Sequence, residues 1–314
     1  MLRLGIVDFD SSHAIEFTRR FNHAGVDADQ RVDGARVVLG CPGTSRMSRE
    51  RIPGFTHEVR ACGVEIVESP TEMIGRIDAV LVLSLCGSAH LAGVRPFLEA
   101  GIPAYVDKPF ACSLDDAEEM IRLAEEHNVL LYHSSALPFS AEVWAFHRQA
   151  DRLGRVNGAI AYGPAKRAEG NPGLFHYGIH SVGLLFALLG TGCESLANEY
   201  ADAAEVVTAR WADGRLGTLR GNRGGATPDA CVAAHPSRVA TRYGFVAFCD
   251  NGVVHQTVST RYAYRNLCRS IVEAFETGTP AVSHEQNLEE VRFVLAALDS
   301  EAGGGKRVSL QSVT

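Results

Sequence analysis

The first part of the chain alternates short apolar runs with stretches in which apolar residues recur every three or four positions. The periodic stretches predict helices, among them 90–100 and 114–127. Uniformly apolar strands joined by helices indicate a parallel sheet that is covered on both faces. We therefore expect a doubly wound α/β domain over residues 1–133. Its strands are predicted at 2–7, 35–39, 64–67, 79–83, 102–106 and 129–132.

After residue 133 the pattern changes to alternating strands that are separated by hairpin turns, as at Asp213-Gly214 and at 250–252. This pattern predicts an α+β domain over residues 134–314, with a large, mainly antiparallel open sheet. An open sheet face needs covering, so we expect a homodimer or homotetramer that forms through this domain. The Gly-rich, polar segment 221–235 is predicted to be a mobile loop. Helices are expected at 141–152, 174–189, 264–276 and 285–297.

Composition limits the function classes. Among 314 residues, 46% are apolar and 21% are charged, which is ordinary for about two globular domains. The net charge of −7 argues against a nucleic-acid partner. We see no apolar run long enough for a membrane span and no signal-peptide core. Eight cysteines without a Cys-x-x-Cys pair fit reduced thiols, so we expect a cytoplasmic protein with a small-molecule ligand.

One candidate site follows the strand predicted at 102–106. The chain reads Asp107-Lys108-Pro109, and a helix then begins after Ser113, whose spacing to Asp116 is a capping-box variant. Ligands of open α/β sheets bind at the carboxyl ends of strands. A lone lysine in such a turn is as readily a solvated turn residue, so the rest of the sequence has to decide.

The second candidate site is His176-Tyr-Gly-Ile-His180. On a helix, residues four apart point the same way. The two histidines could be ordinary helix residues, or zinc ligands, or acid–base groups at neutral pH. No Glu follows His176 and no third ligand is evident, so we predict no metal.

In these motifs the chain resembles the glucose–fructose oxidoreductase and inositol dehydrogenase (Gfo/Idh/MocA) family. That family has Glu-Lys-Pro where this chain has 107–109, and Asp-x-x-x-His where it has 176–180. Ile77-Asp-Ala-Val-Leu-Val, His90, Leu98-Glu-Ala-Gly101 and the segment 280–310 also stand in family order. The resemblance covers nearly the whole chain and implies a Rossmann-type first domain.

The resemblance also implies a function, that of an NAD(P)-dependent oxidoreductase acting on a sugar, polyol or related carbonyl compound. Lys108 would hydrogen-bond the reacting oxygen and anchor the nicotinamide ribose. His180 would move the proton, with His176 as a third catalytic candidate in place of the family's Asp. Pro109 is a candidate cis-proline.

The chain departs from the dinucleotide fingerprint, because Asp8, Asp10 and His13 stand where Gly-x-Gly-x-x-Gly is expected. Asp8 would give up the free backbone of the turn, Asp10 would oppose a pyrophosphate, and His13 would add bulk. The second strand lacks an acidic residue for the ribose, and Arg46 follows it, so NADP is favoured over NAD. The predicted cofactor-binding residues are Phe9, Asp10, Ser11, Ser12, His13, Thr44, Ser45, Arg46, Ser84, Leu85, His90, Asp107 and Lys108.

Two alternatives keep the fold. In one, Lys108, His176 and His180 run a non-redox elimination or hydrolysis without a dinucleotide, and the residues at 8–13, with His90, bind substrate or a divalent cation. In the other, the chain is a non-catalytic, cofactor-free binding relative, since fold does not imply function.

Overall fold

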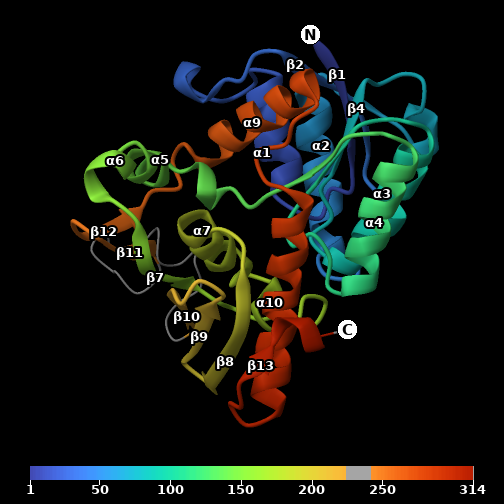
Figure 1. Cartoon of the computed structure of the whole chain (residues 1–314). Helices are drawn as coiled ribbons and strands as arrows, with labels where there is room; N and C mark the ends of the chain where they lie inside the picture. Colours follow the sequence, from blue (N-terminus) through green and yellow to red (C-terminus); the bar gives the residue numbers. More distant parts are fainter. Residues whose placement is uncertain (224–241, 314) are drawn as a thin grey trace. The chain divides into compact units, whose positions relative to one another are not determined.

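The computed structural model describes residues 1–223 and 242–313, and it divides the chain into two compact units (Figure 1). Unit 1 comprises Met1–Ser134 and Tyr264–Asn287, and unit 2 comprises Ser135–Ala263 and Leu288–Thr314. The predicted mobile loop 221–235 lies, from residue 224 on, outside the described residues. Within the described residues no helix is long and apolar enough to cross a membrane.

Unit 1 is built on a six-stranded parallel sheet in the order β3-β2-β1-β4-β5-β6. The order reverses direction between β1 and β4, which is the switch point where open α/β sheets bind ligands. The buried positions of β1 and β4 are apolar, and Leu4 and Val80, for example, are completely buried. The strands are β1 (Leu2–Val7), β2 (Ala35–Cys41), β3 (Glu65–Ile66), β4 (Ala79–Val82), β5 (Ala104–Val106) and β6 (Leu131–His133).

Helices cover both faces of this sheet, as the apolar strands require. α1 (His13–Phe21) packs with α2 (Ile52–Ala61), and α3 (His90–Glu99) packs with α4 (Leu114–Glu126); Figure 1 shows the two pairs on opposite faces. Ser113 caps α4 by accepting a hydrogen bond from the Asp116 amide. The late helix α9 (Ala263–Thr277) completes the unit.

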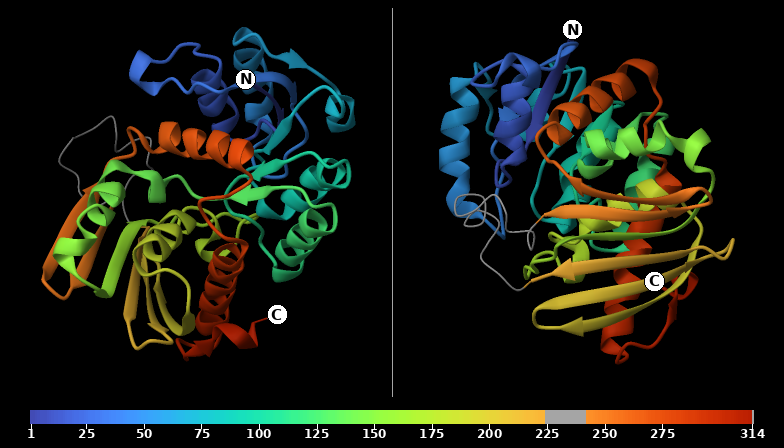
Figure 2. Two further views of the ribbon diagram at one scale, coloured as in Figure 1. Left: turned by 45° about the horizontal axis from the view of Figure 1, so that its top comes forward. Right: turned by 90° about the vertical axis from the view of Figure 1, so that its left-hand side faces the viewer.

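Unit 2 is built on a seven-stranded sheet in the order β12-β11-β7-β10-β9-β8-β13 (Figure 2). The β7–β10 pair is parallel and every other neighbouring pair is antiparallel, so the predicted mainly antiparallel sheet is confirmed. Both predicted hairpin turns join antiparallel strands. The strands are β7 (Val156–Pro164), β8 (Cys193–Ala201), β9 (Ala204–Trp211), β10 (Leu216–Asn222), β11 (Tyr243–Cys249), β12 (Gly252–Val258) and β13 (Val308–Ser309).

Two helix predictions in unit 2 are wrong in extent. The helix expected at 141–152 is two helices, α5 (Ala141–His147) and α6 (Ala150–Leu153). The helix expected at 174–189 is a 3-10 turn, Gly173–Phe175, followed by α7 (Ile179–Leu189). The backbone leaves the helical region at His176, where ψ is −85°, and α7 starts only after Gly178, a weak helix former.

The units differ from the predicted domains 1–133 and 134–314 in one respect. Tyr264–Asn287 groups with unit 1, although it follows unit 2 in sequence. The Tyr264 hydroxyl lies 3.1 Å from Nε2 of His13, and Ser270 lies 2.9 Å from the hydroxyl of Tyr132. The first contact ties α9 to α1, and the second, which is buried, ties it to β6 of the parallel sheet. The last helix, α10 (His284–Ala302), then leads back into unit 2.

Candidate active site

Lys108 lies directly after β5, at the carboxyl edge of the parallel sheet. The Asp107 amide donates to the carbonyl of Val82 at 2.9 Å, which extends the β4–β5 ladder up to the lysine. The Lys108–Pro109 peptide is cis, as predicted. Lys108 is only 8% exposed, and its amine has no hydrogen bond or ion pair among the described residues. A buried ammonium without a protein partner is costly, so such a group is poised for a ligand oxygen.

The backbone before Lys108 is anchored by a buried ion pair. Nδ1 of His13, at the start of α1, lies 2.6 Å from Oδ2 of Asp107, and both side chains are almost fully buried. Burial alone would raise the pKa of Asp107, but the His13 charge and hydrogen bond, aided by Lys108, hold that pKa well below its ordinary value. Asp107 is therefore an anion inside the protein. It supplies a fixed negative charge next to the lysine.

The backbone after Lys108 is held by a buried histidine. Nδ1 of His90 lies 3.1 Å from the carbonyl oxygen of Phe110, and Nε2 lies 2.9 Å from that of Ser84. Burial lowers the pKa of His90. His90 thus joins the loop after β4 to the loop after β5. His133 supports the same loop, because its ring lies 5.0 Å from the Phe110 ring.

The loop after β1 keeps the turn that a glycine would make. Asp8 has φ of 68°, in the left-handed region, so the expectation that Asp8 gives up the turn is wrong. Aspartate is one of the few residues that tolerate this conformation. Asp10 is 3% exposed, and its Oδ1 accepts a 2.9 Å hydrogen bond from the Leu85 amide. The Oγ of Ser11 accepts a 3.3 Å hydrogen bond from the His13 amide.

A cavity of about 810 Å³ opens beside this loop. Five of the residues predicted to bind a cofactor line it: Asp10, Thr44, Ser45, Arg46 and Ser84. Sequence reasoning did not assign other residues that line it, among them Arg60, Glu68, Ala92 and Gly93.

The other predicted cofactor residues of unit 1 do not line the cavity. Phe9 is fully buried against Gly40, where an added Cβ would lie 2.6 Å from Cζ of the ring. His13 and His90 have both ring nitrogens engaged by Asp107, Tyr264 and backbone carbonyls, so they do not converge with Asp8 and Asp10 on a common cation. Outside the cavity lie Phe9, Ser11, Ser12, His13, Leu85, His90, Asp107 and Lys108.

In unit 2, His180 lies in the first turn of α7. Its Nδ1 is 2.9 Å from Oγ of Ser135, and its ring meets that of Tyr243 edge to face at 5.7 Å between centroids. His176 precedes the helix, so the expected pairing of the two histidines on one helical face is wrong. The contact between Ser135 and His180 is one that the sequence did not reveal.

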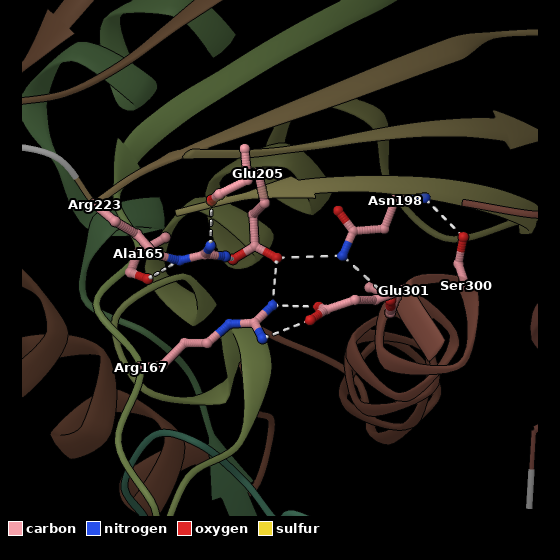
Figure 3. A network of polar contacts seen from close by, with 9 residues as sticks. Ala165, Arg167, Asn198, Glu205, Arg223, Ser300 and Glu301 are labelled. Carbon is pink, nitrogen blue, oxygen red and sulfur yellow. Dashed lines mark hydrogen bonds and ion pairs between the residues drawn. The ribbon is translucent and has the colours of Figure 1, made fainter. Parts of the chain in front are cut away.

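The loop that leads to His176 is fastened by a charged network (Figure 3). Arg167 donates to Glu205 on β9 at 3.1 Å and pairs with Glu301 on α10. Arg223, at the end of β10, pairs with the same Glu205, whose side chain is completely buried. Asn198 Nδ2 donates to Glu205 at 3.2 Å. The network ties the loop, strands β8, β9 and β10, and helix α10 of unit 2 together.

Comparisons with known proteins agree with this architecture. Residues 44–134 match the model of an oxidoreductase family with an NAD-binding Rossmann fold, the Gfo/Idh/MocA family. The resemblance stated from the sequence is therefore confirmed over these residues. No curated protein sequence matches the chain.

Solved structures match over nearly the full length. Scyllo-inositol dehydrogenase from Lactobacillus casei, with bound NAD(H) and scyllo-inositol, is 14% identical with a TM-score of 0.77, covering 99% of this chain and 100% of that one. A myo-inositol dehydrogenase from Corynebacterium glutamicum is 18% identical with a TM-score of 0.76, covering 99% of each chain. An oxidoreductase from Agrobacterium radiobacter in complex with NAD+, L-tartaric acid and magnesium is 15% identical with a TM-score of 0.75, covering 99% of each chain. At these identities the matches establish a shared fold.

Proposed function

We propose that the protein is an NAD(P)-dependent oxidoreductase that transfers a hydride to or from a sugar, polyol or related small carbonyl compound. The observation that carries this proposal is Lys108, a buried cation at the carboxyl end of a strand in a dehydrogenase fold, whose amine has no hydrogen bond or ion pair within residues 1–223 and 242–313. The Rossmann-family match over residues 44–134 supports the cofactor class.

Two features of the cavity support dinucleotide binding: its volume and the backbone turn after β1. It holds about 810 Å³, and the tight turn at Asp8 is kept. Arg46 and Arg60 line it and would receive a 2′-phosphate, which supports the prediction of NADP over NAD. Among the described residues, the lining carboxylates that oppose a pyrophosphate are those of Asp8, Asp10 and Glu68.

The bound nicotinamide would supply or accept the hydride. Lys108 would donate a hydrogen bond to the reacting oxygen and stabilise alkoxide charge, where a preorganised cation is most effective. His180 would take or give the hydroxyl proton, with Ser135 fixing its ring through Nδ1. The buried Asp107–His13 pair would hold the backbone of Lys108 in place.

The test combines cofactor binding with turnover. We expect NADPH or NADH to bind the purified protein, measured by nicotinamide fluorescence, and a panel of sugars and polyols to reveal turnover. Lys108→Ala should lower kcat by about 10²–10³-fold, and His180→Asn by about 10²–10⁴-fold, with cofactor binding retained in the His180 variant. The proposal fails if neither dinucleotide binds at millimolar concentration, or if Lys108→Ala turns over like the unmodified protein.

A second function is favoured by one observation. The Leu85 and His13 amides, which lie by the β1 loop, are taken by the Asp10 carboxylate and the Ser11 hydroxyl. Because these amides already have protein partners, a cofactor phosphate is not required to satisfy them. This favours a non-redox elimination or hydrolysis that Lys108 and His180 would carry out without a dinucleotide. Release of NADP from the denatured, as-purified protein would exclude this alternative. Cytoplasmic location and a homodimer or homotetramer remain predictions.

A further inference from the structure

Two carboxylates line the cavity at the loop after β1, and one of them is unusual. Asp8 adopts the left-handed φ of 68°, and its amide donates to the Cys41 carbonyl at 3.0 Å. Its carboxylate accepts a short hydrogen bond from the Ser84 hydroxyl. It lies so close to Gly43 that an added Cβ there would stand 1.7 Å from Oδ1. The Asp8 carboxylate is therefore fixed in the cavity wall between the ends of β1, β2 and β4.

The electrostatic surroundings of Asp8 favour its neutral form. Burial, together with the charge of Asp10, raises the pKa of Asp8 to about 6, although the Ser84 hydrogen bond opposes the shift. A phosphate brought into the same cavity would add negative charge and favour the protonated acid further. The other titratable or charged groups that line the cavity are Asp10, Cys41, Arg46, Arg60, Glu68 and Cys86.

We propose that Asp8 is the residue that makes this cavity selective for ligand charge, and that a dinucleotide phosphate binds there with the uptake of one proton by the Asp8 carboxylate. The proton comes from solvent and forms an O–H bond on the Asp8 carboxyl group. The neutral carboxyl group then donates a hydrogen bond where a carboxylate would repel the phosphate. This inference rests on the proposed dinucleotide function and adds a condition to it.

The linkage sets the size of the effect. If the complex holds Asp8 protonated, and the free protein titrates near pH 6, the apparent Kd for NADH should rise about 50-fold between pH 6 and pH 8. Proton uptake at pH 8 should approach one per bound ligand. NADH is the better probe, because it lacks the 2′-phosphate of NADPH, which would itself titrate near pH 6.

The experiment is isothermal titration calorimetry of NADH at pH 6 and 8, in two buffers of different ionisation enthalpy. Asp8→Asn keeps the shape of the side chain and suits a left-handed backbone. We expect it to bind NADH with little pH dependence and without proton uptake. Asp8→Gly gives a second variant with no carboxylate. Asp115→Asn, an exposed aspartate in the first turn of α4, is the matched control and should behave like the unmodified protein.

The outcomes separate this inference from the proposed function. If the unmodified protein binds NADH equally at both pH values and without proton uptake, the role of Asp8 is refuted while the dinucleotide function stands. If pH dependence persists unchanged in Asp8→Asn and Asp8→Gly, another group is responsible and the inference is likewise refuted. If neither the unmodified protein nor the variants bind NADH or NADPH at millimolar concentration, both proposals fail.

Discussion

Replacing Glu205 by Gln tests the charged network of unit 2. The substitution keeps the size and shape of the side chain and removes its charge. In the native protein, Glu205 pairs with Arg167 and Arg223 and accepts a hydrogen bond from Asn198 (Figure 3). After the substitution, Arg167 retains Glu301, whereas Arg223 loses its only carboxylate among the described residues.

The magnitude follows from burial. The Glu205 side chain is 0% exposed and that of Arg223 is 9% exposed, so solvent cannot take over the lost interaction. Removing one partner of a buried ion pair typically costs about 3–5 kcal/mol, because the other charge stays desolvated. Arg223 also stacks on Tyr200, with the guanidinium carbon 4.2 Å from the ring centroid, which moderates the cost. We therefore expect a loss of about 3 kcal/mol in the free energy of unfolding of unit 2.

Tryptophan fluorescence during urea unfolding measures this loss in the right unit. Both tryptophans of the chain, Trp144 and Trp211, belong to unit 2, and Trp211 is 1% exposed on the same strand as Glu205. With a urea slope of about 2–3 kcal/mol per M, the midpoint should fall by about 1–1.5 M. Glu199→Gln, an exposed glutamate on the neighbouring strand β8, is the control and should shift it little. Equal midpoints for the two variants would show that the network contributes nothing to stability.

Two further predictions concern unit 1. His13→Ala leaves the buried Asp107 carboxylate without its hydrogen-bond partner, so unit 1 should lose about 3 kcal/mol of stability at pH 7, visible by calorimetry. Because the pKa of Asp107 is depressed, this difference should shrink as the pH falls below about 4, and an unchanged difference at low pH would contradict the interaction. Asp8 has a pKa raised to about 6 from an ordinary 3.8, so its contribution to stability is full below pH 3.8 and is lost as the pH rises through 6. Asp8→Asn should then be more stable than the unmodified protein by about 3 kcal/mol at pH 8 and by much less at pH 4; the same gain at both pH values would rule out titration of Asp8 as the cause.

The sequence predicted the fold because its signals are local. Apolar runs predicted the six strands of unit 1, and the hairpin turns at 213–214 and 250–252 predicted the antiparallel sheet of unit 2. The missed helix α2 shows the limit of such signals. It begins Ile52-Pro53-Gly54, residues that read as a loop, yet proline is well tolerated in the first turn of a helix. Because α2 was not predicted, Arg60, which lines the cavity from that helix, was not identified either.

The candidate site was predictable only where one residue type defines the chemistry. Lys108 was identified from its neighbours and lies where expected. The pairing of His176 with His180 depended on an uninterrupted helix, and the backbone departs from the helical region at His176, before α7 begins. Ser135 could not be found in advance, because its contact with His180 joins residues 45 positions apart.

Two residues that differ from the motifs expected from the sequence, His13 and Asp107, are in direct contact in the structure. Taken separately, His13 in place of the glycine of the dinucleotide fingerprint adds bulk. Asp107 in place of the glutamate of Glu-Lys-Pro has a side chain that is shorter by one methylene. In the structure the two side chains meet at 2.6 Å in a buried ion pair. A glutamate at 107 would extend its carboxylate about one bond length further, into the space that the imidazole now fills, so the shorter acid makes room for the larger base. The two positions are 94 residues apart in sequence and in contact in the structure, so helix α1 anchors the backbone that presents Lys108.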